Sequence, residues 1–309
     1  MSIKAEGSAL ISALFIMTLV AIAATAMSTR LQLDIYRTRM TIVHDKSYLA
    51  SQLVAFWAMS TLSHKKEPNT TRDPTGKLMN FPVPFQHAYP DVTITGQLTD
   101  LQSRFNVNNV QNTSYQPMFF NLLKDTVARG TEDQYRLILA ATVRWVSPYA
   151  IGQHRDEFLD HYITQNPAYL PAYQPMKNIS EFRLVEGVNA RIYQLMSPHV
   201  TALPEITPLN INTANKHVLK ALGHGLTEND VNELLKARDK EGIKTLQALN
   251  PLLQRLDIAA DQITLESHYF ASVAHVSTPD QELTNTTVFK RTENKKGKVT
   301  ITILSETLS

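Results

Sequence analysis

The sequence predicts an α+β fold, in which a long N-terminal helix accompanies an antiparallel sheet that carries a large inserted all-α domain. Three observations support this fold class. Residues 8–67 contain neither glycine nor proline, so no residue there interrupts a helix. Segments rich in valine, threonine and isoleucine occur at residues 92–98 and again after residue 268. The residues between these segments have helical periodicity, which indicates a helical insertion in one sheet.

The composition excludes several classes of protein. Of the 309 residues, 43% are hydrophobic and 19% are charged, which excludes a disordered chain and a polytopic membrane protein. The formal net charge is +2, so electrostatics gives no reason to expect nucleic acid as a partner. Cysteine is absent, which excludes disulfides, cysteine-bound metals and thiol nucleophiles.

The first expected element is a helix over residues 8–67, of which residues 8–28 are expected to cross a membrane. No side chain from Ser8 to Thr29 is charged, and a helix of about 20 residues spans roughly 30 Å, the thickness of a bilayer core. After Arg30 we expect an amphipathic helix, because apolar residues recur at helical spacing. These residues are Leu33, Tyr36, Met40, Val43, Leu49, Leu53, Phe56, Trp57 and Leu62.

The start of the chain leaves three interpretations open. Lys4, the apolar stretch and the small residues Ala24 and Ala26 fit a secretory signal peptide. The same stretch fits a plain single-span anchor. Met1 to Gly7 also has the form of a prepilin-type leader, a short polar segment that is removed after glycine while the apolar helix is retained. The helical pattern continues through Ala26 without a turn signal, which favours the third interpretation.

The membrane orientation is not decided by charge. Lys4 and Glu6 offset each other before the apolar segment, whereas Arg30, Arg37 and Arg39 follow it. A positive-inside count places the bulk of the chain in the cytoplasm. A prepilin-type leader requires the opposite orientation.

The later elements follow in order. Residues 65–90 contain several prolines and are expected to be irregular. We expect a strand at Val92–Leu98 that pairs with Asp100–Val107. We expect helices within 118–146, 179–196 and 216–256, and a long loop over 147–175. Strands are expected at 268–276, 286–291 and 298–304, with a turn at 294–297 between the last two. The expected domains are therefore a leader at 1–7, a sheet region at 68–110 and 264–309, and an inserted helical domain at 111–263.

The helical domain contains a partial repeat of helix, glycine turn and helix. Asn212 or Thr213 is the expected N-cap of its second unit. The hairpin at Leu222–Leu226 resembles helix-hairpin-helix (SAM-like) units, some of which hold DNA phosphate with backbone amides. This hairpin lacks the usual sequence, and the charges that follow it have mixed signs. A packing role is therefore favoured over DNA binding.

Catalytic motifs are absent from the sequence. There is no GxSxG, HExxH, P-loop or GxGxxG pattern, so we expect no enzyme. His154 and His161 lie near three carboxylates, but their spacing matches no known ligand set, and an exposed polar loop is favoured. These carboxylates are Asp156, Glu157 and Asp160.

Four features together resemble the general secretion pathway protein K family, the large minor pseudopilins of type II secretion systems. The first is Gly7 followed by Ser8-Ala9-Leu10-Ile11, and the second is the segment Gln102–Asn109. The third is Gln174-Pro175-Met176 leading into Ser180–Gly187, and the fourth is Leu209–Ala214. The resemblance implies a pilin-like sheet against the long helix.

The resemblance also implies a function. A prepilin peptidase would cleave between Gly7 and Ser8, and Ser8 would be methylated. Ser8, Ala9, Leu10, Ile11 and Ser12 would begin the helix used in subunit assembly, with Ser12 where most pilin-like subunits carry glutamate. The protein would span the inner membrane once, with its bulk in the periplasm. It would form the pseudopilus tip with other minor pseudopilins and initiate assembly for protein export across the outer membrane.

Family members usually bind calcium through aspartates that follow the tryptophan equivalent to Trp145. This chain has Val146-Ser147-Pro148 there, so the first carboxylates are missing and no cofactor is expected. The alternative function is a secreted protein with a signal peptide, whose hairpin domain binds a polymer such as DNA.

Overall fold

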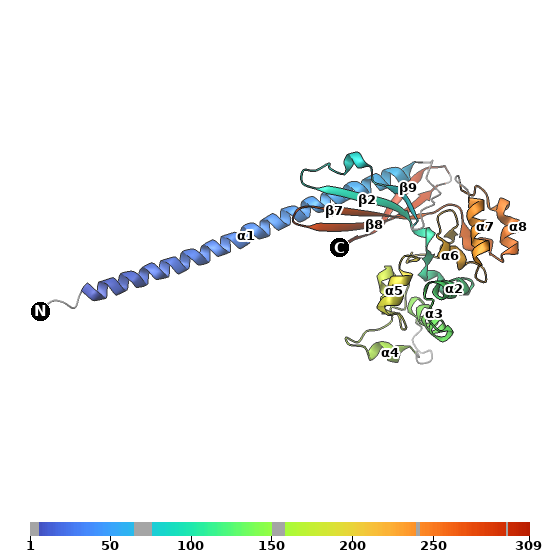
Figure 1. Cartoon of the computed structure of the whole chain (residues 1–309), viewed down its shortest axis with the longest axis horizontal. Helices are drawn as coiled ribbons and strands as arrows, with labels where there is room; N and C mark the ends of the chain where they lie inside the picture. Colours follow the sequence, from blue (N-terminus) through green and yellow to red (C-terminus); the bar gives the residue numbers. More distant parts are fainter. Residues whose placement is uncertain (1–5, 65–75, 150–157, 239–241, 295) are drawn as a thin grey trace.

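The structure, a computed structural model, describes residues 6–64, 76–149, 158–238, 242–294 and 296–309. One long helix, α1 (Glu6–Ser63), extends from a body that contains a sheet and a helical region (Figure 1). The second half of α1 lies along the sheet, and its first half projects away from the body (Figure 1). The predicted α+β class is confirmed.

The main sheet has five strands in the order β1-β2-β7-β8-β9, and all neighbours are antiparallel. Its members are β1 (Lys77–Asn80), β2 (Thr93–Asp100), β7 (Tyr269–Ser277), β8 (Glu282–Glu293) and β9 (Val299–Leu308). β2 pairs with β7 along its full length, from Thr93 opposite Ser277 to Asp100 opposite Phe270. The helical region therefore leaves the sheet after β2 and returns to it at β7.

The helical region between β2 and β7 is built from short elements. Its helices are α2 (Gln116–Thr126), α3 (Glu132–Val146), α4 (Leu159–Ile163), α5 (Ala190–Met196), α6 (Lys216–Lys220), α7 (Glu228–Arg238) and α8 (Asn250–Arg255). Two short parallel pairs join β3 (Phe105–Asn106) to β4 (Val200–Thr201) and β5 (Leu209–Asn210) to β6 (Ile263–Thr264). The strands of the main sheet lie within 68–110 and 264–309, and the domain boundaries stay a prediction.

Small side chains let α1 lie close to the sheet. The buried stripe of α1 consists of Ser47, Ala50, Ser51, Val54, Ala55, Ala58 and Leu62. These positions follow helical spacing, so they form one face. Opposite them on β2, a Cβ added to Gly96 would lie 2.6 Å from Val54 Cγ1, closer than real contacts allow. Glycine at this position is therefore required by the close approach of helix and strand.

The inserted region has its own aromatic core. Phe119 stacks on Phe105 with ring centroids 5.5 Å apart and meets Phe182 edge-on at 6.1 Å. Trp145 packs in the same core, 5.6 Å from Tyr162. These residues come from β3, α2, α3 and later segments, so one hydrophobic core joins the first and second halves of the region.

Two predictions about the strands are wrong. Asp100–Val107 does not pair with β2. The Asp100 carboxylate accepts a hydrogen bond from the Gln102 amide at 2.8 Å, and this turn directs the chain out of the sheet. The edge partner of β2 is instead β1, which lies in the segment expected to be irregular. The strand expected at Val92–Leu98 is confirmed as β2.

The helix predictions need smaller corrections. α1 ends at Ser63 rather than Glu67, and residues 65–67 lie outside the described residues. Of the nine apolar side chains that suggested an amphipathic helix, four are exposed and one, Leu62, is buried. The exposed ones are Leu33, Tyr36, Leu49 and Phe56. Small residues carry little hydrophobic signal, and for this reason the periodicity did not separate the buried stripe from the exposed side chains.

Candidate functional site

The predicted processing residues lie at the beginning of α1. Gly7, Ser8 and Ser12 fall in its first turns, and leader residues 1–5 lie outside the described part of the chain. The side chains of Leu10 and Ile11 are 73% and 71% exposed. Among the described residues, α1 is the one helix long and apolar enough to cross a membrane, and its apolar window has no buried residue. By length and composition, α1 is suited to anchor the protein in a membrane.

The second half of α1 has an exposed apolar seam on the side away from the sheet. The seam consists of Ile35, Ile42, Leu49 and Phe56, which are between 59% and 64% exposed. They recur every seven residues, and two helical turns take about seven residues, so they form one stripe. Apolar stripes of this spacing pack against other helices. The seam was not recognised from the sequence, because it is separated from the buried stripe only once the sheet is in place.

Polar contacts hold this half of α1 on the body. Arg39 pairs with Asp280 at 2.8 Å, and Lys46 donates to the carbonyl of Pro90 at 2.5 Å. Gln52 donates to Glu306 of β9 at 2.5 Å. These contacts reach three separate parts of the sheet region. The seam is therefore presented at a defined position relative to the body.

A buried carboxylate lies where the sheet meets the helical region. Asp100 Oδ2 accepts hydrogen bonds from Thr213 Oγ1 at 2.5 Å, Ser267 Oγ at 2.7 Å and Asn210 Nδ2 at 3.1 Å. Burial raises the pKa of Asp100, whereas its hydrogen bonds oppose this effect. Asp100 thus joins the end of β2 to β5 and to the segment before β7.

Buried asparagines explain the motif at Gln102–Asn109. Asn108 Nδ2 donates to the carbonyls of Met176 and Leu203, and its Oδ1 accepts from the amide of Met176 at 2.8 Å. Asn106 and Asn109 bond the backbone of residues 203–207 in the same way. The side chains of the motif therefore bind the backbone of Met176 and of residues 203–207. Their role is to hold these segments together.

The Leu209–Ala214 motif is also structural, and its predicted cap is wrong. The N-cap of α6 is Asn215, whose Oδ1 accepts from the Val218 amide at 3.0 Å, rather than Asn212 or Thr213. Asn212 instead exchanges two hydrogen bonds with the backbone of Ile243. Tertiary partners occupy both of the side chains expected to cap the helix.

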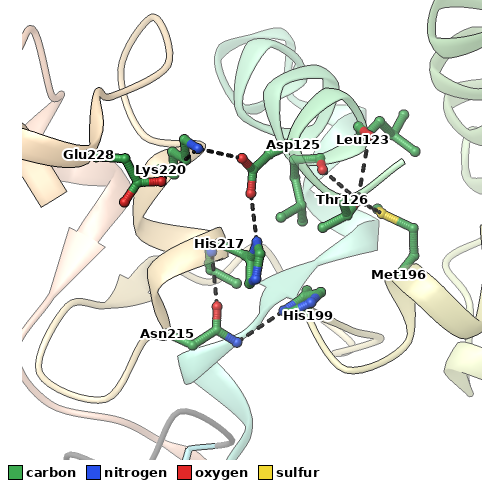
Figure 2. Close-up of polar contacts among 11 residues, drawn as sticks. Leu123, Asp125, Thr126, Met196, His199, Asn215, His217, Lys220 and Glu228 are labelled. Carbon is green, nitrogen blue, oxygen red and sulfur yellow. Dashed lines mark hydrogen bonds and ion pairs between the residues drawn. The ribbon is translucent and has the colours of Figure 1, made fainter. Parts of the chain in front are cut away.

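A polar cluster connects α2, α6 and the segment before β4 (Figure 2). Asp125 accepts from His217 Nδ1 at 2.7 Å and from Lys220 at 2.9 Å. The rings of His199 and His217 lie 4.8 Å apart. Because the Asn215 oxygen is occupied by the Val218 amide, its Nδ2 faces His199 Nδ1 at 3.0 Å and donates to it.

This geometry requires a neutral His199. The ring nitrogen that faces Asn215 accepts a hydrogen bond, so it carries no proton. Burial, followed by the charge of neighbouring His217, lowers the pKa of His199 to about 4. The cap of α6 is thus tied to the protonation state of one histidine.

The hairpin at Leu222–Leu226 packs on the body through its two ends, whereas His224 and Gly225 at its tip are exposed. Gly223 has φ +57°, and a Cβ there would lie 2.7 Å from the carbonyl oxygen of Leu256. Leu222 and Leu226 on either side are buried. The glycine therefore serves a close contact with the end of α8, which agrees with the packing role favoured from the sequence.

The suspected metal residues are only partly described. His154, Asp156 and Glu157 lie outside the described residues. His161 Nδ1 lies 3.5 Å from Glu186 Oε1. Within the described ranges, no three histidine or acidic side chains are grouped in a way that could hold a metal ion. The expectation that this chain lacks the family's calcium site stays a prediction.

Comparison with known proteins assigns the family. Two family models, both described as type II secretion system protein K, match residues 103–205 and 209–266, which together are just over half of the chain. The chain belongs to the type II secretion system protein K family. The matched ranges contain the Leu209–Ala214 motif, the Gln102–Asn109 motif except Gln102, and the aromatic core.

Curated relatives agree with this assignment. Type II secretion system protein K of Klebsiella pneumoniae is 33% identical over 58% of this chain and 59% of its own length. The Pseudomonas aeruginosa protein is 29% identical over 46% of this chain and 42% of its own length, so these two matches span less than two thirds of each relative. The Aeromonas hydrophila protein is 29% identical over 94% of both chains.

A solved structure shares the fold of this family member. It is described as the crystal structure of the GspK-GspI-GspJ complex from the type 2 secretion system of enterotoxigenic Escherichia coli. The match has a TM-score of 0.69 and 21% sequence identity, and it covers 88% of this chain and 99% of the other. At this identity the match establishes the fold, whereas the two family models confirm the resemblance drawn from the sequence.

Proposed function

We propose that this protein is a minor pseudopilin that forms the tip of a type II secretion pseudopilus with other minor pseudopilins and initiates its assembly. Its role is structural: it supports protein export across the outer membrane, and we assign it no catalytic step. The related solved structure is a complex of three such proteins, which supports partners of this kind.

The observation that carries the proposal is the exposed seam on α1. Ile35, Ile42, Leu49 and Phe56 offer an apolar stripe beyond the membrane segment, and the sheet does not cover it. Exposed apolar side chains at this spacing are stabilised when another amphipathic helix covers them. The α1 helix of a second pilin-like subunit has the shape and chemistry to do so.

The start of α1 supports a place at the tip. In lipid, a buried glutamate needs a partner, which in pilin-like subunits is the amino terminus of a neighbour. Ser12 occupies this position here, so the subunit does not need a neighbour above it. The inserted helical region adds bulk at the far end of the sheet (Figure 1), which opposes further stacking.

Processing and orientation belong to the same proposal. A prepilin peptidase removes residues 1–7 at the cytoplasmic face, Ser8 becomes the methylated first residue, and the body lies in the periplasm. The intact mass and N-terminal sequence of the full chain from membranes test this. A start at Ser8 with one added methyl group is expected. A start at Met27 would indicate a signal peptide and the secreted alternative, and an uncut Met1 would leave a plain anchor with the orientation that charge favours.

Cross-linking tests the seam directly, because the native chain has no cysteine. Leu49→Cys and Phe56→Cys in the full chain, labelled with a benzophenone maleimide, are illuminated in membranes that co-express the other minor pseudopilins. We expect covalent products with those pseudopilins. Thr41→Cys is the matched control, since it is exposed and lies about 100° around the helix from Ile42. Equal products from Thr41→Cys, or none from the seam positions, would contradict the proposal.

A further inference from the structure

A cavity of about 390 Å³ lies in the helical region, well away from the α1 seam. The connection between α2 and α3, residues 126–130, forms one side of it, and α5 forms the other. Its size is within the range of small-ligand sites. Neither the buried asparagine motifs nor the proposed assembly surface uses it.

The polar side chains of the cavity are all hydrogen-bond donors or amides. Arg129 and Arg191 line it from opposite elements, and neither has an ion pair within the described ranges of the chain. Asn189 also lines it, and its Oδ1 accepts from the Ile192 amide at 2.9 Å, which leaves its NH₂ group as a donor. No aspartate or glutamate is among the described lining residues. The cavity therefore favours an anionic acceptor.

The remaining surface of the cavity is apolar. Leu195, which is 38% exposed, is the accessible apolar side chain of the lining, and the buried side chains of Val127 and Ile192 lie beside it. A bare inorganic anion would leave Leu195 uncovered. A ligand that combines a carboxylate with an apolar group would satisfy both parts of the lining, because an arginine fork binds a carboxylate through two parallel hydrogen bonds.

The loop that carries Arg129 has a defined shape. The Val127 amide donates to the carbonyl of Leu123 at 2.8 Å, and the Tyr135 hydroxyl donates to the carbonyl of Val127 at 2.5 Å. A Cβ on Gly130 would lie 2.4 Å from the Tyr135 ring, so only glycine fits there. The loop is thus held by packing before any ligand arrives, which reduces the entropy lost on binding.

We propose that this cavity binds a carboxylate joined to an apolar side chain, as found in the last residue of a peptide chain that ends in leucine. The inference goes beyond the proposed assembly role and does not depend on it, since α1 contributes nothing to the cavity. It assigns to the helical region a binding function for which the sequence offered no signal, because Arg129 and Arg191 are far apart in the chain.

Ligand titrations on the full chain in a nonionic detergent test this proposal. The probes are N-acetyl-leucine, N-acetyl-leucinamide and a hexapeptide ending in leucine with a free or an amidated terminus, each followed by calorimetry and ligand-observed NMR. We expect the free carboxylates to bind and both amides to bind at least about tenfold more weakly, since the amides lack the charge that pairs with arginine. Tighter binding of the hexapeptide than of N-acetyl-leucine would identify a chain terminus as the source of the carboxylate.

Two variants and one control make the result specific. Arg129→Gln and Arg191→Gln should each weaken binding of the free carboxylates, and together they should abolish it. Arg136→Gln is the matched control, because Arg136 is an exposed arginine of α3 that pairs with Glu132 and does not line the cavity. Thermal unfolding of each variant, followed by tryptophan fluorescence, distinguishes a lost site from a lost fold. Equal binding of acid and amide, unchanged binding in the double variant, or no binding of any carboxylate would overturn the proposal.

Discussion

Asp100 at the end of β2 accepts a hydrogen bond of 2.5 Å from the hydroxyl of Thr213, a residue 113 positions further along the chain. The same carboxylate is bonded by Ser267, just before β7. One buried side chain therefore connects the strand that leaves the sheet, the inserted region, and the segment that returns to the sheet. This arrangement ties the helical region to the sheet by more than its two chain connections.

Asp100→Ala should destabilise the protein strongly. The change leaves the Thr213 and Ser267 hydroxyls and the Asn210 amide buried without their acceptor, and we expect a loss of about 3 kcal/mol or more in the free energy of unfolding. Asp100→Asn, which keeps the shape and one acceptor oxygen, should cost less. Urea unfolding of the full chain in detergent measures both changes.

The two tryptophans show which part of the protein the Asp100→Ala substitution destabilises. Trp57 packs on the sheet side, 5.6 Å from Phe81, and Trp145 lies in the helical core, so Trp57→Phe and Trp145→Phe backgrounds report each part separately. We expect both transitions to shift in Asp100→Ala. Glu293→Ala, at an exposed end of β8, is the control and should change stability by less than about 0.5 kcal/mol. A loss no larger than that of the control would contradict the role of Asp100.

Asn108→Ala should loosen the loop that ends at Met176. Three hydrogen bonds to buried backbone groups are lost, and the carbonyls of Met176 and Leu203 keep no replacement donor from alanine. We expect a destabilisation of about 2–4 kcal/mol. Asn112→Ala is the matched control, because Asn112 is exposed and caps a short turn. It should lower the free energy of unfolding by about 1 kcal/mol. Thermal unfolding of the two variants compares them, and similar melting temperatures would refute the prediction.

Gly96→Ala should separate α1 from the sheet. The new methyl group would lie 2.6 Å from Val54 Cγ1, and Val54 is fully buried, so helix and strand must move apart. Overpacking of this kind costs about 1–3 kcal/mol. Thr95→Ala, the exposed neighbour on the other face of β2, should be close to neutral. Trp57 fluorescence and melting temperature monitor the change, and a Gly96→Ala protein as stable as Thr95→Ala would show that the contact relaxes without cost.

His199 should make stability depend on pH. The folded pKa is about 4, below the ordinary value of 6.5, so between these values the unfolded chain binds a proton that the folded chain does not. Stability from neutral His199 is therefore complete above pH 6.5 and is lost as the pH falls toward 4. The charged groups that act on the ring are His217, Arg104 and Asp125.

His199→Gln removes this dependence and keeps an acceptor for Asn215. The ring is partly exposed, so its effect is reduced by solvent. Between pH 7 and pH 4 we expect the free energy of unfolding of the variant to fall by about 1 kcal/mol less than that of the wild type. Urea midpoints at both pH values measure the difference. His275→Gln, at an exposed histidine of β7, should keep the wild-type dependence. Parallel pH profiles for the wild type and His199→Gln would rule out this assignment.

Local patterns in the sequence predicted much of the fold. The uninterrupted residues 8–63 specify α1, and the β-branched segments specify β2, β7, β8 and β9. Strand β1 was missed because Lys77–Asn80 is short and lies among prolines and glycine. Its pairing depends on the edge that β2 offers and not on its own residues.

The candidate site was predictable only at its beginning. The charge-free stretch after Gly7 determines a membrane-competent helix, because hydrophobicity and helical rise are properties of consecutive residues. The tertiary structure alone decided which face of α1 the sheet covers, which partners Asp100 and Asn215 find, and that Arg129 and Arg191 line the same cavity. These features depend on contacts between residues far apart in the chain, and no local periodicity records such contacts.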